Sequence, residues 1–274
     1  MPKKRKLFCE YGPVCYAIAV EKERLRRRLT DALRRTPLAK RRGSLLPAVW
    51  KSHSSVLVRA LHGVDMDLQR SKVKNLFLAG QRLDGLIIAP GEVFSFWHAI
   101  GRCTKRRGYQ PGMTLQGGRV GAAVGGGLCQ LANLVHYMVL HSPLQVEELH
   151  HHTDALFPDA GRRVPFGTGT SVFYNHIDYR FRNTTDVPVQ LHIWQDDTFL
   201  YGELRAATPL SAQYELVEED HHFACEDGQW YRNSRVFRCV TDDAGQVTRE
   251  CILVNHSRVM YDPALIPPEH IRNT

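Results

Sequence analysis

Residues 125–141 read GGGLCQLANLVHYMVLH and hold the strongest pattern in the chain. After the glycines nearly every position is apolar, which predicts a helix from Leu128 to His141 that is buried on almost all sides and ends before Pro143. Three consecutive glycines permit backbone conformations that other residues avoid. The pattern therefore places Cys129 in the first turn of a buried helix, directly after a tight turn.

Segments with strand character flank this helix on both sides. Each is a short run of apolar or alternating residues bounded by turn residues. We expect 171–181 to pair with 187–194 as a hairpin through the turn at 183–186. The predicted strands lie at 113–120 (a hairpin closed by Gly117-Gly118), 145–149, 171–181, 187–194, 198–204, 214–217, 235–240 and 247–255.

Apolar residues at helical spacing predict two further helices, at 21–35 and 67–86. The expected fold class is α+β, with a mainly antiparallel sheet packed on the buried helix that carries Cys129 and with basic helices at the N-terminus. We expect three segments: a basic helical N-terminal segment at 1–60, a core domain at 61–206 and a small β-rich C-terminal appendage at 207–274.

Positive charge is concentrated in the N-terminal part of the chain. Residues 1–59 hold 16 Lys and Arg against 4 Asp and Glu, whereas the remaining residues hold 20 basic and 24 acidic side chains. A basic helix of this kind can contact an anionic surface, or it can be solvated without a partner. We expect no specific nucleic-acid partner.

The cysteine count and the hydropathy limit the cellular locations that are expected for the protein. Seven cysteines without a CxxC pair do not indicate a disulfide framework. No stretch approaches the roughly 18 apolar residues of a spanning helix, and the apolar run at 7–20 is interrupted and makes a poor signal peptide. The expected location is cytoplasmic or peripheral to a membrane, and no cofactor is expected.

The cysteine at the start of the buried helix is the strongest candidate for chemistry. The positive end of a helix dipole lowers the pKa of a thiol in the first turn and makes it a better nucleophile. Backbone amides of Gly125, Gly126 and Gly127, together with the side chain of Gln130, could stabilise an oxyanion. The sequence thus predicts a nucleophile, Cys129, beside an oxyanion loop.

A thiol nucleophile needs a base and an orienting group. His152, at the end of the strand after the helix, is the expected general base, and Asp178 is the expected orienting carboxylate. His150 and His151 are adjacent alternatives. The chain order Cys, His, Asp is also that of transglutaminase-like and papain-related thiol enzymes, which is an analogy at the level of the fold.

Other interpretations of these residues stay open. Cys129 can be an inert core cysteine behind a glycine turn, and the three histidines can be exposed side chains without a role. The three histidines could also bind a metal, with Cys129, His136 or Asp178 as partners, but seven helical positions separate Cys129 from His136 by about 10 Å, too far to share one ion. A phosphate loop is disfavoured because no Lys-Ser/Thr pair follows the glycines.

Three stretches together resemble the VanW family: PGEVFSFW at 90–97, GGGLCQLANL at 125–134 and IDYRFRNTTD at 177–186. The resemblance implies an accessory role in glycopeptide (vancomycin) resistance and cell-wall metabolism, with a cell-wall peptide or precursor as partner. Family members usually carry an aspartate two residues after the glycine that matches Gly167, whereas this chain has Gly169.

Two functional hypotheses are consistent with the residues and the resemblance. The first is a thiol-dependent acyl-transferase or amidohydrolase that acts on a wall-related peptide, with Cys129 as nucleophile. The second is a non-catalytic protein that binds such a peptide or its precursor. Aromatic residues would then line a groove or pack in the core: Phe94, Phe96, Trp97, Tyr109, Phe173, Tyr174 and Tyr179.

Overall fold

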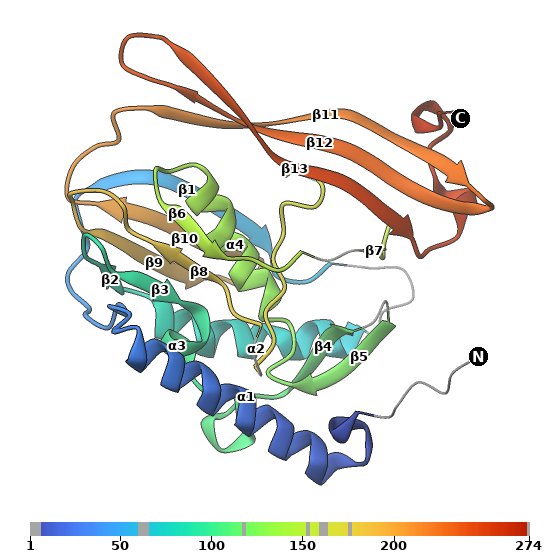
Figure 1. The fold of residues 1–274 in the computed structure, drawn as a ribbon, viewed down its shortest axis with the longest axis horizontal. Helices are drawn as coiled ribbons and strands as arrows, with labels where there is room; N and C mark the ends of the chain where they lie inside the picture. Colours follow the sequence, from blue (N-terminus) through green and yellow to red (C-terminus); the bar gives the residue numbers. More distant parts are fainter. Residues whose placement is uncertain are drawn as a thin grey trace.

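The structure is a computed structural model that describes residues 7–59, 66–116, 119–151, 154–158, 164–174 and 177–272. It confirms a mixed α+β fold with antiparallel sheets (Figure 1). The sequence predicted a mainly antiparallel sheet packed on the buried helix. In the structure the strands divide among four sheets within the described residues.

The core is built around helix α4 (Cys129–Leu140), which packs against strands β1 (Ala48–Val56) and β10 (Phe199–Ala206). Leu131, Val135 and Met138 are completely buried there. This helix is apolar on nearly every side because a sheet and a second helix cover it. The sheet has the order β1-β10-β9-β2, with β9 at Val189–Gln195 and β2 at Ile87–Ile88.

The predicted hairpin between 171–181 and 187–194 is wrong. Only Arg180–Arg182 forms a strand, β8, and it pairs with β3 (Val93–Ser95) and β6 (Gln145–Glu148) in a separate sheet, whereas β9 pairs with β10 and β2. Val172 and Tyr179 lie outside the strands but are buried in the core, and Phe181 of β8 is buried too, so the alternation in 171–181 reflects burial and not one continuous strand.

Helix α2 (Met66–Leu83) and the hairpin β4 (Pro111–Gln116) and β5 (Arg119–Val124) close another side of the core. The predicted helix and hairpin at these places are confirmed, although the turn glycines 117 and 118 lie outside the described residues. The short helices α3 (Phe96–Ile100) and η2 (Lys105–Arg107) connect β3 to β4.

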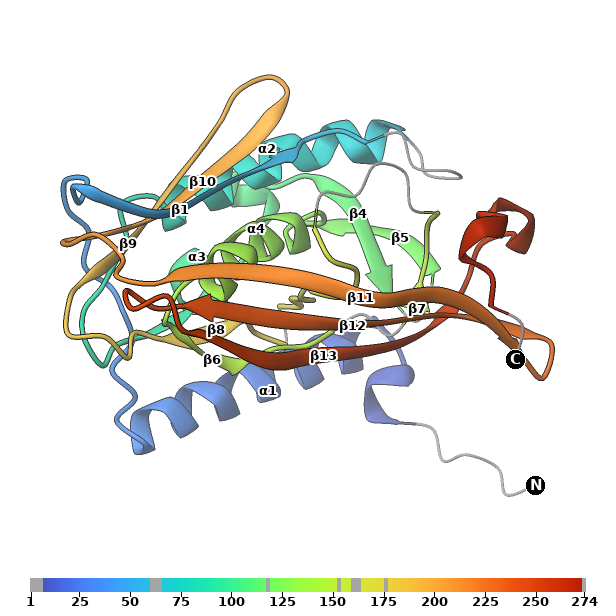
Figure 2. The ribbon, with the colours of Figure 1, turned by 90° about the horizontal axis from the view of Figure 1, so that it is seen from above.

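Three long strands form the C-terminal sheet along one side of the molecule (Figures 1 and 2). They are β11 (Gln213–Glu226), β12 (Gln229–Thr241) and β13 (Val247–Val259), with the short parallel strand β7 (Asp154–Ala155) at the edge of β13. A small apolar cluster supports this sheet, separate from the main core. The 3-10 turns η3 (Pro263–Leu265) and η4 (Pro268–His270) follow.

Helix α1 (Pro13–Leu33) lies on the opposite side of the core from this sheet, after the short turn η1 (Phe8–Glu10) (Figure 1). It begins eight residues earlier than the predicted start at residue 21, because Pro13 at the first helical position suits a helix N-terminus. None of its residues is fully buried. Within the described residues, no helix has the length and hydropathy that crossing a bilayer requires.

Candidate functional site

A cavity of about 890 Å³ opens at the N-terminal end of α4. Its wall includes residues of β1, α2, β4, β5 and α4, together with the segments 164–169 and 172–174. The turn Gly125-Gly126-Gly127 and Cys129 both belong to this wall. The glycine turn and the first residues of α4 therefore form part of the wall of this cavity.

The glycines of the turn are required by close packing. A Cβ atom at Gly126 would lie 2.0 Å from the carbonyl oxygen of Gly112, and one at Gly127 would lie 2.5 Å from Cβ of Lys72. Gly127 also has a φ of 94°, which L side chains rarely adopt. Asn75 of α2 fixes the turn from below, because its side-chain amide donates to the carbonyl of Gly126 over 2.9 Å.

Cys129 is the first residue of α4, and its thiol donates weakly to the carbonyl of Val172 over 3.7 Å. Burial raises the pKa of this thiol above its ordinary value. This direction is opposite to the lowering that a helix N-terminus is expected to cause, and loss of hydration is its largest cause. The residue as a whole keeps part of its surface exposed on the cavity wall.

The donors expected to form an oxyanion hole have internal partners. The side-chain amide of Gln130 donates to Ser55 Oγ over 2.9 Å and to the carbonyl of Val56 over 2.8 Å. The backbone amide of Gly125 donates to Gln110, that of Gly126 to Ala123, and that of Gln130 to Gly127. These groups hold the turn and β1 in place, and a ligand would have to displace those bonds to use them.

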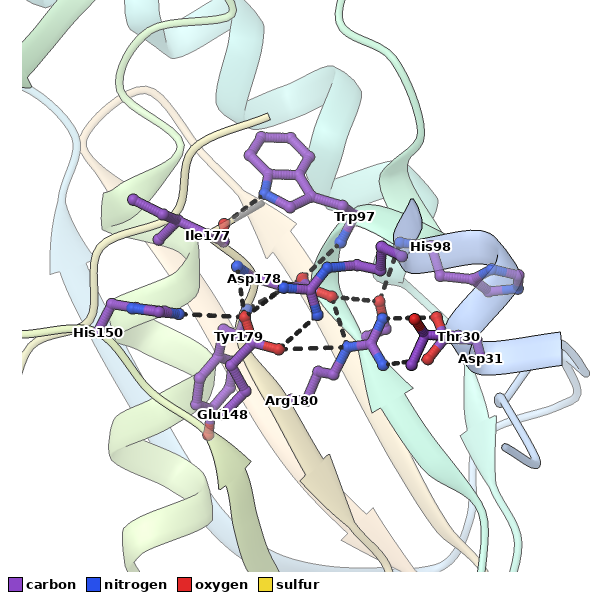
Figure 3. Close-up of polar contacts among 12 residues, drawn as sticks. Thr30, Asp31, Trp97, His98, Glu148, His150, Ile177, Asp178, Tyr179 and Arg180 are labelled. Carbon is purple, nitrogen blue, oxygen red and sulfur yellow. Dashed lines mark hydrogen bonds and ion pairs between the residues drawn. The ribbon is translucent and has the colours of Figure 1, made fainter. Parts of the chain in front are cut away.

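Asp178 is almost completely buried, with 1% of its surface exposed, and lies in a different network (Figure 3). Its carboxylate accepts hydrogen bonds from Ser95 Oγ at 2.6 Å, from Arg180 Nε at 2.9 Å and from the backbone amide of Trp97 at 3.0 Å. Its own neighbour Tyr179 donates a further backbone bond. Asp178 thus joins PGEVFSFW at 90–97 to IDYRFRNTTD at 177–186.

The same network fastens α1 to the core through charged groups. Arg180 makes a bidentate pair with Asp31 of α1, at 2.7 and 2.8 Å. Arg27 of α1 makes another with Glu148, at 2.5 and 2.8 Å. Burial alone would raise the pKa of Glu148, but the hydrogen bonds from Arg27 and His150 lower it below its ordinary value.

The histidines that were candidates for a base do not converge on the sulfur in the described part of the chain. His150 contacts Glu148 at 3.1 Å, and His151 contacts the carbonyl of Gly167 at 2.9 Å. His152 lies outside the described residues. His136 is buried against the hydroxyl of Tyr179 at 3.1 Å, and burial lowers its pKa to about 3.

A metal site does not form from the histidines, cysteines and carboxylates that the structure describes. The metal interpretation needed Cys129, His136 or Asp178 beside the three histidines, and each of these side chains has its own partner instead.

Lys72 is a cavity residue that the sequence analysis missed. It is 5% exposed, lies on the buried face of α2 and lines the cavity together with Arg59. Burial, and then the nearby charge of Arg59, lower the pKa of Lys72 to about 8. The signal was present in the sequence, because stepping back three or four residues at a time from Leu83 and Leu76 along the buried face of α2 reaches Lys72.

Aromatic side chains form the remaining apolar part of the wall. Trp97 and Tyr174 meet edge to face with ring centroids 4.9 Å apart, and His53 lies against Tyr137 at 4.1 Å. The indole of Trp97 donates to the carbonyl of Ile177 over 2.9 Å, so its ring is held in one orientation (Figure 3). Apolar walls with a few fixed polar groups are typical of sites for small ligands.

Comparison with known proteins agrees with these motifs. The family model described as "VanW like protein" matches residues 71–205. The chain carries a VanW-like domain. This domain contains α2, the glycine turn, α4 and the Asp178 network, and so most of the cavity wall.

Two curated relatives share part of this region. The chain is 34% identical over 176 residues to the vancomycin B-type resistance protein VanW of Enterococcus faecalis, and 28% identical over 120 residues to the uncharacterized protein YoaR of Bacillus subtilis. These alignments cover 64% and 44% of this chain, but only 64% and 38% of the relatives. No solved structure shows a significant match.

The position where VanW-family members usually have an aspartate is also on the cavity wall. A Cβ atom at Gly169 would lie 3.3 Å from the side chain of Asn133, which itself accepts the backbone amide of Thr170 at 2.6 Å. Gly169 brings no side-chain charge to the cavity wall.

Proposed function

We propose that this chain is a VanW-like accessory protein of glycopeptide resistance that binds a cell-wall peptide or its precursor in the cavity at the N-terminal end of α4. The observation that carries the proposal is the cavity itself, which is of ligand size and lies within the matched domain. The relative in Enterococcus faecalis supplies the biological setting, since its name is that of a vancomycin B-type resistance protein.

The state of the polar groups favours binding over catalysis. A nucleophilic thiol needs a low pKa and a base, whereas burial raises the pKa of Cys129. The side-chain amide of Gln130 and the backbone amides of Gly125 and Gly126 already donate to other groups. The carboxylate of Asp178 is engaged as well. A binding site needs none of these groups to react.

A second candidate function is a thiol-dependent acyl transfer or amide hydrolysis. The position of Cys129 in the first helical turn, on the wall of the cavity, favours it. In such a reaction the thiolate adds to a carbonyl carbon of the bound peptide and expels its amine or alcohol. Water or a second amine then releases the acyl group from sulfur, with His152 as the proposed base, Asp178 as its orienting group and Gln130 and the glycine turn stabilising the oxyanion.

Binding is tested by calorimetry with an acetylated alanyl-alanine peptide and two variants of strand β5. Ala123 lines the cavity, whereas Ala122 is its neighbour on the other face of the strand. Ala123→Trp fills the cavity and is expected to abolish binding, and Ala122→Trp is expected to preserve it. Equal affinity in the two variants, or no binding by the unaltered chain, would refute the proposed site.

The two functions are separated at Cys129. Cys129→Ala should leave peptide binding and resistance intact if the protein acts by binding. It should abolish turnover and resistance, with binding retained, if the sulfur is a nucleophile.

A further inference from the structure

We propose that Lys72 is the anchor for a carboxylate group of the ligand in this cavity. The inference rests on the proposed function, because it names the group by which the peptide is recognised.

Lys72 is a cation without a counterion. In the described part of the chain it has no hydrogen-bond or ion-pair partner, although 95% of its surface is covered. Loss of hydration makes an ammonium costly unless a negative group accompanies it, and this loss is the largest cause of the lowered pKa of about 8. A lysine kept in such a place is explained by a partner that arrives with the ligand.

The surroundings favour an anion. Arg59 adds a second positive charge to the wall, and Asp154 is the acidic residue among the described lining residues. The carboxylate of Asp154 lies 3.9 Å from the guanidinium of Arg258, so part of its charge is balanced there. Gly169, which lacks a side chain, leaves the opposite wall without a further charge.

The position of Lys72 also suits recognition. Its aliphatic stem packs on Gly127, as the 2.5 Å approach to a hypothetical Cβ of that glycine shows, so the side chain is held against the turn that precedes α4. The N-terminal end of a helix of this length adds favourable potential for an anion. A carboxylate at Lys72 would place the attached residues along the wall formed by Cys129 and the aromatic rings.

The test compares two peptides that differ in one group: N-acetyl-alanyl-alanine with a free carboxylate, and the same peptide as its C-terminal amide. The unaltered chain should bind the acid about 10- to 100-fold more tightly than the amide, because a charge-assisted bond is lost. Lys72→Met should remove this preference. Lys74→Met, an exposed neighbour on the same helix, should retain it.

The outcomes separate this inference from the proposed function. Equal binding of acid and amide by the unaltered chain would overturn the role of Lys72 and leave the binding function standing. If neither peptide binds, the proposed function fails. The role of Lys72 as a carboxylate anchor is then tested separately, by following the titration of its amine by NMR. Sodium acetate that raises the titration midpoint of that amine supports an anion site, and an unchanged midpoint overturns it.

A second inference comes from an independent feature, the outer face of α1. We infer that this face binds the interface of an anionic lipid bilayer. The helix is attached to the core by charged pairs, including Arg27 with Glu148 and Asp31 with Arg180. The face turned to solvent is apolar instead, and five residues there expose more than half of their surface: Val14, Ile18, Leu25, Leu29 and Leu33.

This arrangement reverses the usual pattern of a surface helix, which buries its apolar stripe. An apolar stripe bordered by basic residues is typical of helices that lie in a membrane interface. Exposed basic side chains lie within or beside the stripe: Lys22, one turn after Ile18, lies within it, and Arg26, Arg28 and Arg35 lie beside it. A second copy of the chain is a poorer occupant, because pairing two such helices would bring like charges together.

Vesicle sedimentation tests this surface. The chain should bind vesicles that contain phosphatidylglycerol, and less strongly those of phosphatidylcholine alone or at high salt. Leu25→Glu with Leu29→Glu should weaken binding about 30- to 100-fold, because two leucines lose their apolar environment. Val254→Glu, at an equally exposed apolar residue of β13, should not.

The alternative occupant would give a different result. A dimer in solution that the leucine substitutions dissociate, without vesicle binding by the unaltered chain, would overturn the membrane inference and assign the face to a second copy.

Discussion

Replacing Lys72 by methionine is expected to stabilise the protein. Methionine has nearly the shape of the lysine stem and keeps the contact with Gly127, but it carries no charge into the cavity. The pKa of Lys72 falls from an ordinary value of 10.5 to about 8 in the folded chain. At about 1.4 kcal/mol for each pH unit, this corresponds to up to about 3.5 kcal/mol of unfolding free energy at pH 7.

The stability gained by Lys72→Met depends on pH, and this dependence provides the control. Between about pH 8 and 10.5 the unfolded chain holds a proton on this lysine that the folded chain has released. The unaltered protein therefore gains stability from this group as the pH rises through that range. The advantage of Lys72→Met should be complete at pH 7, smaller at pH 9.5 and nearly absent above pH 10.5.

Urea denaturation of the variant and the unaltered chain, at pH 7 and pH 9.5, measures this difference. Lys74→Met serves as the control, because an exposed lysine should change stability by no more than about 0.5 kcal/mol. A Lys72→Met protein that is less stable at pH 7, or whose advantage does not depend on pH, would refute the view that this lysine is buried without a counterion.

Three further predictions concern the scaffold. Arg180→Met should lower the unfolding free energy by about 3–5 kcal/mol, because Asp178 and the partly buried Asp31 lose their cation. Arg182→Met, at a more exposed ion pair, should lower it by less than about 1 kcal/mol, and urea denaturation distinguishes the two variants. Gly126→Ala should prevent folding or lower the unfolding free energy by more than about 3 kcal/mol, because the new methyl group would lie 2.0 Å from a carbonyl oxygen. Gly121→Ala, whose methyl group would lie 3.3 Å from its nearest neighbour, should have a smaller effect. Equal losses of stability in thermal denaturation would contradict this reasoning. His136 has its pKa lowered to about 3, so the unfolded chain binds the extra proton between about pH 6.5 and 3; stability should fall with decreasing pH in that range, and His136→Phe should remove about 1.4 kcal/mol per pH unit from the slope.

Local patterns predicted the elements around the cavity well. The continuous apolar run at α4 and the glycine-rich hairpin of β4 and β5 each contain their own signal within about 15 residues. The turn before Cys129 was also predicted, since three glycines indicate close packing by themselves.

Long-range pairing was not predictable from the same patterns. The segment 171–181 has the alternation of a strand, but its partners are the core and the distant strands β3 and β6. Asp178 was assigned to an active site on its position in the chain, whereas its carboxylate binds Ser95 and Arg180. A single sequence does not show which distant donors will reach a carboxylate, and only the fold brings them together.

The burial of Lys72 was predictable only in part from the local pattern. An apolar stripe drawn through Phe77, which is 47% exposed, points slightly away from the true buried face of α2. A stripe centred on Leu76 and Ala79 would have reached Lys72 and marked a charged residue among apolar ones.

The most direct test of the account is a crystal structure of the chain with N-acetyl-alanyl-alanine. We predict that the peptide occupies the cavity beside Gly127 and Cys129, with its carboxylate about 3 Å from Nζ of Lys72 and no bond to sulfur. A peptide bound elsewhere, or a covalent bond between its acyl group and Cys129, would contradict this account.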